Sequence, residues 1–190
     1  MDYFYTSPSL VKPRTLAIEG EELHHLSKVL RKKVGDTICV VDGKEHAYKV
    51  VLTSISKTRA DCEIQETFHR LNEPDLDVKL AVALLKNPSR FDFLVEKCTE
   101  LGVREFIPVR TERTIVSKVH TERLQKIALS AMKQCGRSFL PPIHSPMDFH
   151  EALTYLKACE RKFITHEKAD EMIADGGRKV TGGSSGTVGV

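Results

Sequence analysis

Residues 84–113, LLKNPSRFDFLVEKCTELGVREFIPVRTER, decide the fold, because they read as a capped helix between two strands. The apolar run 80–85 fits a short buried strand. Asn87 can cap the helix that follows, and Pro88 then takes its first position, where a missing N–H costs nothing. The run 106–109 makes the next strand. Since a strand, helix and strand of this length form a right-handed parallel unit, we expect a parallel sheet covered by helices.

The helix in this stretch has one apolar face, which predicts the side that it buries. Gly102 follows the last apolar position and can take the left-handed backbone conformation that ends a helix. The residues of the apolar face recur at helical spacing and are Phe91, Leu94, Val95, Cys98 and Leu101.

Two loops leave the carboxyl ends of these strands, and both carry basic residues. Loops at this edge build the ligand site of an open parallel sheet. Lys86 and Arg90 follow the first strand, and Arg110 and Arg113 follow the second. We therefore expect this edge to face a polyanion, with Lys86, Arg90 and Arg110 as contacts to phosphate.

The charge of the chain is uneven, although its net value is only +3. Residues 104–137 contain eight Lys and Arg against three Asp and Glu, whereas the flanking segments are close to neutral. A local basic patch on a near-neutral protein suits a nucleic-acid backbone. The alternative is a solvated helix face without a partner.

Several classes of protein are disfavoured by composition. No apolar run approaches the ~20 residues that cross a bilayer, and the start MDYFYTSPSL lacks the features of a signal peptide. We therefore expect a cytoplasmic protein that makes no contact with a membrane. Five cysteines without a C-x-x-C pair fit reduced thiols and predict neither a disulfide framework nor a metal site.

The organisation of the chain predicts an α+β protein of two domains. Residues 1–72 read as a small β-barrel with a helix at 21–31, and its strands are expected at 37–41, 47–52 and 59–65. The polar run 69–77, HRLNEPDLD, marks the boundary, and 78–190 read as an α/β domain. In that domain we expect further helices at 121–135, 149–159 and 168–174, and parallel strands at 162–165 and 186–190.

With these elements placed, the chain resembles the bacterial 16S ribosomal RNA uridine N3-methyltransferases of the SPOUT superfamily. The run 96–103, EKCTELGV, carries most of the resemblance, together with the loop around Arg113. Other matching positions are His24, 29–31 (VLR), Gly35-Asp36, Lys86, Gln134, Arg137 and Pro141-Pro142. The resemblance implies an N-terminal PUA-like β-barrel that binds RNA, followed by a SPOUT-type parallel-sheet domain.

The activity that the resemblance implies is methyl transfer from S-adenosylmethionine to N3 of a uridine in 16S rRNA of the small ribosomal subunit. Arg113 and Arg137 are the candidate catalytic residues, because arginine can stabilise a developing uracil anion. Arg137 could instead stabilise the carboxyl end of its helix. The barrel contributes a second set of RNA contacts, which are Lys28, Arg31, Lys32 and Lys33.

The cofactor site is expected at the end of the strand 162–165, where such folds place cofactor loops. Thr165, His166 and Glu167 could contact the adenosine, although a simple turn explains them equally well. In the family, a strand similar to GTVGV is followed by a G-P-E-G-G loop and a trefoil knot, and the family is dimeric. Because this chain stops at GTVGV, we expect an incomplete cofactor site, weak binding of S-adenosylmethionine and no methylation by the chain alone, with the homodimer belonging to the full-length protein.

Two other functions compete with this interpretation. The barrel and the basic residues could form an RNA-binding module without catalytic activity. A nucleotide-binding Rossmann-type protein is the weaker alternative, because Asn87-Pro88 occupies the turn where a G-x-G-x-x-G sequence would lie.

Overall fold

Strand pairing divides the chain into two five-stranded sheets, one in each of two units. The computed structural model describes residues 2–112, 114, 119–165 and 187–189, the last three by their backbone alone. One unit contains residues 1–73 and 129–140, and the other contains 74–128 and 141–190. Each unit is described by itself.

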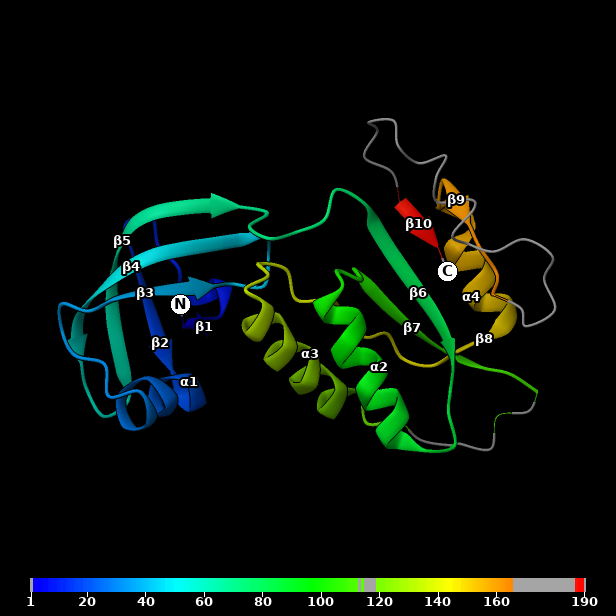
Figure 1. Cartoon of the computed structure of the whole chain (residues 1–190), viewed down its shortest axis with the longest axis horizontal. Coiled ribbons are helices and arrows are strands. Elements are labelled where there is room, and N and C mark those ends of the chain that lie inside the picture. Colours follow the sequence, from blue (N-terminus) through cyan, green and yellow to red (C-terminus); the bar gives the residue numbers. More distant parts are fainter. Residues whose placement is uncertain (1, 113, 115–118, 166–186, 190) are drawn as a thin grey trace. The chain divides into compact units, whose positions relative to one another are not determined.

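The first unit is a curled sheet in the order β1-β3-β4-β5-β2 (Figure 1). Strand β1 is parallel to β3, and the other neighbours are antiparallel. Helix α1 is followed directly by one π-helical turn, η2, and the two together match the helix predicted at 21–31, although α1 begins one residue earlier. The elements are β1 (Tyr3–Tyr5), η1 (Pro8–Leu10), β2 (Thr15–Glu19), α1 (Gly20–His24), η2 (His25–Val29), β3 (Thr37–Val41), β4 (His46–Ile55) and β5 (Arg59–His69).

The turn between β3 and β4 is organised by a buried carboxylate. Asp42 accepts hydrogen bonds from the backbone N–H of Lys44 at 2.7 Å and from the Tyr48 hydroxyl at 3.1 Å. Burial, together with the charge of Asp42, raises the pKa of Tyr48 to about 12. Gly43 has a φ of +70°, a conformation that suits glycine. The strands predicted at 37–41 and 47–52 are therefore confirmed, and they pair as a hairpin.

The second unit is a parallel sheet in the order β8-β7-β6-β10-β9. Helices α2 and α4 lie on opposite faces of this sheet (Figure 1). Helix α3 contributes residues up to Ala128 to this unit and the rest to the first. The elements are β6 (Asp77–Ala83), α2 (Pro88–Glu100), β7 (Glu105–Arg110), α3 (Thr121–Cys135), β8 (Met147–Asp148), α4 (Phe149–Tyr155), η3 (Leu156–Ala158), β9 (Arg161–Lys162) and β10 (Thr187–Gly189).

Helix α2 begins as predicted, but its inner face differs from the prediction. The Asn87 side chain accepts a hydrogen bond from the backbone N–H of Ser89 at 3.0 Å, so Asn87 is the N-cap. Phe91, Val95 and Thr99 are buried, whereas Leu101 is 81% exposed. Leu101 lies at the C-cap, where the helix ends and its side chain turns toward solvent.

The terminal strands confirm the parallel sheet and correct one boundary. Strand β10 pairs in parallel with both β6 and β9, as predicted for 186–190. The strand predicted at 162–165 begins one residue earlier, and within the described residues it spans Arg161–Lys162, which pair with β10. The helix predicted at 168–174 lies outside the described residues. No helix in the described part of the chain is long and apolar enough to cross a membrane.

Candidate functional site

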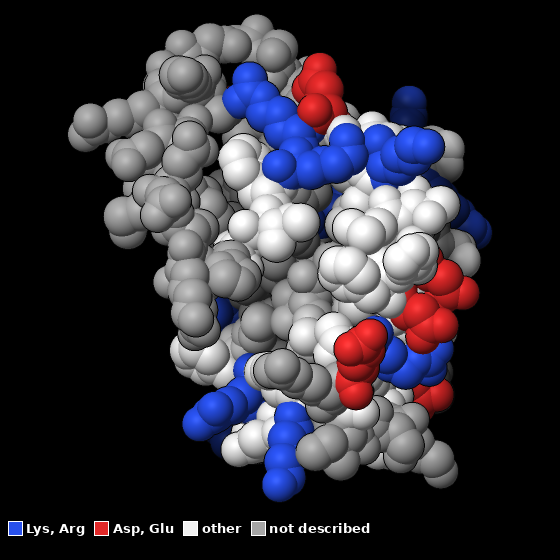
Figure 2. All heavy atoms as spheres, turned by 90° about the vertical axis from the view of Figure 1, so that its right-hand side faces the viewer, with Lys and Arg blue, Asp and Glu red and all other residues white. Residues whose placement is uncertain are grey.

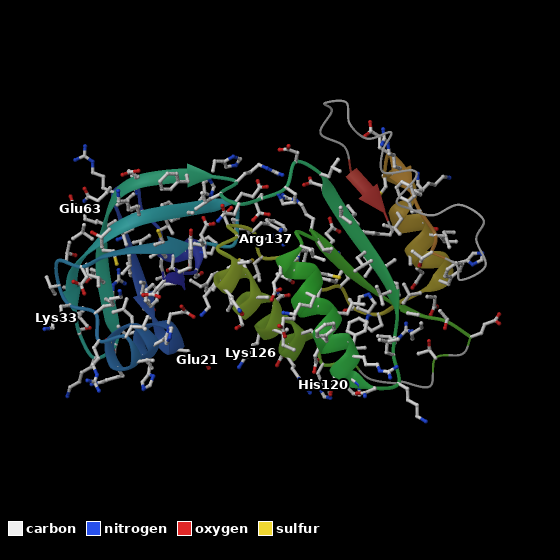
Figure 3. The ribbon with its side chains drawn as sticks, in the orientation of Figure 1. Glu21, Lys33, Glu63, His120, Lys126 and Arg137 are labelled. Carbon is white, nitrogen blue, oxygen red and sulfur yellow. The ribbon has the colours of Figure 1, made fainter. Side chains whose placement is uncertain are left out.

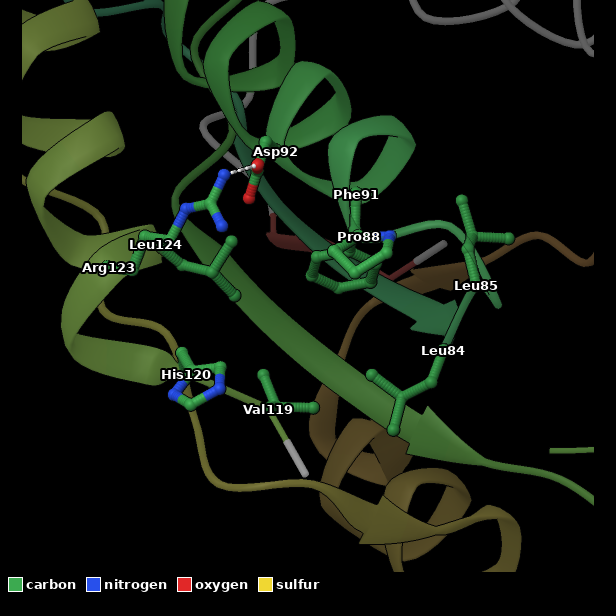
Figure 4. Close-up of a pocket in the computed structure, with 9 residues that line it drawn as sticks. All are labelled: Leu84, Leu85, Pro88, Phe91, Asp92, Val119, His120, Arg123 and Leu124. Atoms are coloured by element: carbon green, nitrogen blue, oxygen red, sulfur yellow. Dashed lines mark hydrogen bonds and ion pairs between the residues drawn. The ribbon is translucent and has the colours of Figure 1, made fainter. Parts of the chain in front are cut away.

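A small pocket lies at the carboxyl end of β6, where the parallel fold predicts a ligand site (Figure 4). Its walls come from the residues after β6, the first turns of α2 and the start of α3. The ladder between β6 and β7 continues into the pocket, because the Leu84 N–H donates to the Val109 carbonyl at 3.0 Å. The pocket encloses about 70 Å³ and is lined by Leu84, Leu85, Pro88, Phe91, Asp92, Val119, His120, Arg123 and Leu124.

The polar side of this pocket is an ion pair between α2 and α3. The Arg123 guanidinium donates to the Asp92 carboxylate, and the two side chains face each other in Figure 4. The Asp92 side chain is 17% exposed and that of Arg123 is 60% exposed. The carboxylate is therefore largely covered, while part of the guanidinium can still reach a ligand.

The predicted phosphate contacts of this unit lie at the same edge of the sheet. Lys86 and Arg90 are exposed and are chain neighbours of pocket residues. Arg110 ends β7 and pairs with Asp148 at 3.4 Å, beside a second, shallow hollow. The six residues that line the hollow are all exposed, and they are Arg110, Thr111, Glu112, Asp148, Phe149 and His150.

The basic segment 104–137 provides less free positive charge than its sequence suggests. Most of its described cations pair with acidic side chains from other parts of the chain, and Figure 2 shows Lys and Arg in separate groups. Lys126 extends from α3 and is exposed (Figure 3). The paired cations are Arg104 with Asp77, Arg110 with Asp148, Arg123 with Asp92, Lys133 with Glu22 and Arg137 with Glu73.

Arg137 is placed where it holds the fold of the first unit, which differs from the predicted contact with a base. Its side chain is 2% exposed, and its guanidinium donates to the Glu73 carboxylate, with the shortest contact at 2.6 Å. Glu73 is 1% exposed and also accepts from the backbone N–H groups of Ser138 and Phe139, both at 2.9 Å. Arg137 therefore closes a buried hydrogen-bonded pair and is not presented to a ligand.

A second polar cluster lies on the α4 face of the parallel sheet. Glu105 receives hydrogen bonds from Tyr155 at 2.6 Å and Lys79 at 2.9 Å, and His144 lies 3.2 Å away. Burial alone would raise the pKa of Glu105, but the bonds from Tyr155 and Lys79 and the charge of Lys79 lower it overall. This cluster was not predictable from the sequence, because its members are brought together by the parallel register Lys79↔Glu105.

The predicted RNA contacts of the first unit lie in the π-helical turn or directly after it. Lys28, Arg31 and Lys33 are exposed, and Lys33 points away from the sheet (Figure 3). Lys32 pairs with Asp2 at 3.3 Å. Arg31 has a φ of +53°, which is uncommon for a residue other than glycine. A π-helical turn and such a residue often accompany function.

Of the predicted cofactor residues and the predicted catalytic residue Arg113, the structure describes only Thr165. Thr165 is exposed beyond β9, while Arg113, His166 and Glu167 lie outside the described residues. The pocket of about 70 Å³ is smaller than the ~300–1,000 Å³ of usual small-molecule sites, and the second hollow is lined by exposed residues. The pocket is therefore too small for S-adenosylmethionine, whereas the hollow encloses about 720 Å³ but is open to solvent.

The sequence analysis also missed the polar side of the pocket. Asp92 lies on the first turns of α2, and His120 and Arg123 lie at the start of α3. Asp92 and Arg123 are 31 positions apart, which hides their proximity in the sequence. The available clue was that the loops before α2 and α3 both leave the carboxyl edge of one parallel sheet.

Comparison with known proteins identifies both parts of the chain. A family model described as an RNA methyltransferase domain matches residues 72–188, and one described as an RNA methyltransferase PUA domain matches residues 18–65. These matches confirm the predicted order of a PUA-like domain followed by an α/β domain with a parallel sheet.

Individual relatives agree with these families. A protein of Synechocystis named ribosomal RNA small subunit methyltransferase E is 36% identical over 145 residues, which cover 75% of this chain and 47% of that protein. The Bacillus subtilis protein of the same name is 30% identical over 174 residues, covering 87% of this chain and 67% of that protein. The chain thus spans about half to two thirds of the length of these curated relatives.

A solved structure extends the comparison to three dimensions. The Neisseria gonorrhoeae ribosomal RNA small subunit methyltransferase E, bound to S-adenosyl methionine, is 29% identical with a TM-score of 0.78. The match covers 100% of this chain and 78% of that one. With a parallel sheet, a PUA-type domain and a family match over most of its length, this chain belongs to the RNA methyltransferase family.

Proposed function

We propose that this protein methylates N3 of a uridine in 16S ribosomal RNA and uses S-adenosylmethionine as the methyl donor. The observation that carries the proposal is the family match over residues 72–188, which includes the pocket and both basic loops. The names of the Synechocystis and Bacillus subtilis relatives support a substrate in the small ribosomal subunit. The methyl donor bound to the Neisseria gonorrhoeae relative supports the choice of cofactor.

The roles of individual residues follow from where the structure places them. Lys86, Arg90 and Arg110 are exposed at the carboxyl edge of the sheet and suit contacts with phosphate. Arg113 remains our candidate for stabilising the uracil anion, because it belongs to the loop that follows Arg110. We assign Arg137 a positioning role through Glu73 in place of contact with the base. The second set of RNA contacts comprises Lys28, Arg31, Lys32 and Lys33.

The cofactor would supply the methyl group. Thr165, His166 and Glu167 remain proposed contacts to its adenosine. We further propose that the protein works in the cytoplasm, where its ribosomal substrate is assembled, and that it forms a homodimer. The chain would then meet the small subunit through RNA contacts from both of its units.

Binding to RNA is the first test of this proposal. The protein should bind 16S rRNA with an affinity that falls as salt rises, because phosphate contacts release counterions. A change of Lys86 to Ala should weaken binding and reduce the slope of log affinity against log salt by about one unit. Filter binding over a salt series measures both quantities.

A matched change in the same unit provides the control. Lys157 lies in η3, away from the carboxyl ends of β6 and β7, and is exposed. Lys157→Ala should leave the slope unchanged. Equal slopes for the parent protein and Lys86→Ala would contradict the phosphate contact. An RNA-binding module without catalytic activity would also pass this test. Measuring N3-methyluridine among the nucleosides of 16S rRNA separates the two functions, because only the enzyme produces it.

A further inference from the structure

The pocket after β6 has the chemistry of a site for one planar ring. Its walls are apolar, and Phe91 contributes an aromatic ring that is only 6% exposed. Figure 4 shows Leu84, Pro88 and Phe91 on one side and Val119, His120 and Leu124 on the other. Proteins that act on nucleic-acid bases hold the displaced base between aromatic and apolar side chains of this kind.

The polar groups of the pocket are concentrated on one side. Arg123 has only hydrogen-bond donors, and Asp92 accepts from it, which fixes the direction of the guanidinium. His120 lies beside Arg123 at the start of α3 and is exposed. Donors at this position suit a ring edge that carries carbonyl oxygens. Uracil has two carbonyl oxygens, whereas cytosine has an amino group in place of one of them.

The surroundings of the pocket favour a base that is still part of an RNA strand. Lys86 and Arg90 are exposed and flank the pocket residue Pro88 in the sequence. From there they can bind the phosphates on the two sides of a displaced nucleotide. A volume of about 70 Å³ is far below that of usual sites for whole cofactors. The size therefore disfavours a whole cofactor, and the charge favours a base that belongs to a bound RNA.

We infer that this pocket receives the uracil ring of the substrate, with the apolar side chains against its faces and Arg123 donating to O4, the carbonyl oxygen that an amino group replaces in cytosine. Asp92 is then a positioning residue, because it acts on the base through Arg123. This inference rests on the proposed function, and it adds the place where the target base is held and the group that distinguishes uracil from cytosine.

Photochemical crosslinking tests the inference with the full chain. A 16S rRNA transcript that contains 5-bromouridine in place of uridine is bound and irradiated, and the attached peptides are identified by mass spectrometry. We expect attachment within 84–92 or 119–124, and at least a tenfold lower yield there with a 5-bromocytidine transcript. Comparable yields at the pocket from the two transcripts would overturn the assignment of uracil.

Substitution of Arg123 supplies the second arm. Arg123→Ala should lower the crosslink yield at the pocket several-fold and reduce the preference for uracil over cytosine, and Arg123→Lys should retain part of both. Lys126→Ala is the control, because Lys126 is exposed on the same helix but does not line the pocket. If Arg123→Ala behaves like Lys126→Ala, the role of Arg123 is refuted.

Two further outcomes separate this inference from the proposed function. Attachment of RNA only at other peptides, with RNA affinity intact, would overturn the pocket assignment and leave the proposed function standing. Absence of any binding to 16S rRNA would overturn both. Loss of the pocket crosslink when S-adenosylmethionine is added, without loss of RNA binding, would show that the pocket takes the adenine of the cofactor.

Discussion

At the scale of single residues, the buried pair of Arg137 and Glu73 has the largest predicted effect on stability. Changing Glu73 to Ala leaves the guanidinium of Arg137 buried without its main carboxylate partner. We expect a loss of about 3–5 kcal/mol in the free energy of unfolding, because an uncompensated buried charge is costly. Urea denaturation followed by circular dichroism measures this change.

Two controls test whether the buried charge causes the loss of stability in Glu73→Ala. Replacing both partners, as in Glu73→Leu with Arg137→Met, should restore much of the stability, since no charge then remains buried. Glu66→Gln breaks the exposed pair with Lys49 and should cost less than about 1 kcal/mol. If Glu73→Ala costs no more than Glu66→Gln, the pair does not have the structural role that its burial implies.

The cluster around Glu105 predicts a dependence of stability on pH. The pKa of Glu105 is lowered in the folded protein, although burial opposes the shift. A lowered pKa contributes stability above the pKa of the unfolded chain, and this contribution is lost as the pH falls through the folded value. The parent protein should therefore exceed Glu105→Gln in stability near neutral pH.

This advantage should shrink below about pH 4, where glutamate in an unfolded chain is protonated. Denaturation curves of both proteins at a series of pH values measure the difference. Tyr155→Phe removes one donor to Glu105 and should reduce the advantage in part. A difference that stays constant from about pH 3 to 7 would show that the carboxylate is not stabilised by this cluster.

The chemistry of single residues was predictable where it depends on neighbours in the chain. Asn87 was found as a helix cap because a cap acts on residues two positions away. The pair of Arg137 with Glu73 could not be foreseen, because the two residues are 64 positions apart and spacing arguments do not reach so far. The exposure of Leu101 could not be foreseen either, since helical periodicity does not locate the last turn.

At the scale of elements, the cap of α2 fixes both the helix and the loop that forms the pocket. Changing Asn87 to Ala removes the acceptor for the Ser89 N–H and should cost about 1 kcal/mol. Asn87→Asp keeps an acceptor and should be close to the parent. Thermal denaturation compares the three proteins, and equal midpoints for Ala and Asp would contradict the capping role.

The sequence predicted strands and helices well where their patterns are long. Strands β3 to β5 and helix α3 were found because they are alternating or periodic runs with clear boundaries. The short strands β1, β2 and β8 were missed, because their pairing partners come from distant parts of the chain. Strand β9 was predicted too far along the chain, toward the apolar residues Phe163 and Ile164, whereas its register is set by β10.

At the scale of the whole molecule, the sequence predicted a β domain before an α/β domain, and the family matches confirm that order. Residues 129–140 group with the first unit, although they follow the parallel strands in the chain. The Lys44↔Phe139 bridge and the Glu73 carboxylate hold them there. A single boundary at 72–78 does not describe this return of residues 129–140 to the first unit. The boundary therefore remains a proposal.

The central claim is that this protein places a methyl group on N3 of a uridine in 16S rRNA. The most direct measurement is the nucleoside composition of 16S rRNA, by mass spectrometry, from cells with and without the gene. We predict that N3-methyluridine disappears from 16S rRNA when the gene is deleted and returns when the gene is restored. An unchanged amount of N3-methyluridine in 16S rRNA after deletion would contradict the claim.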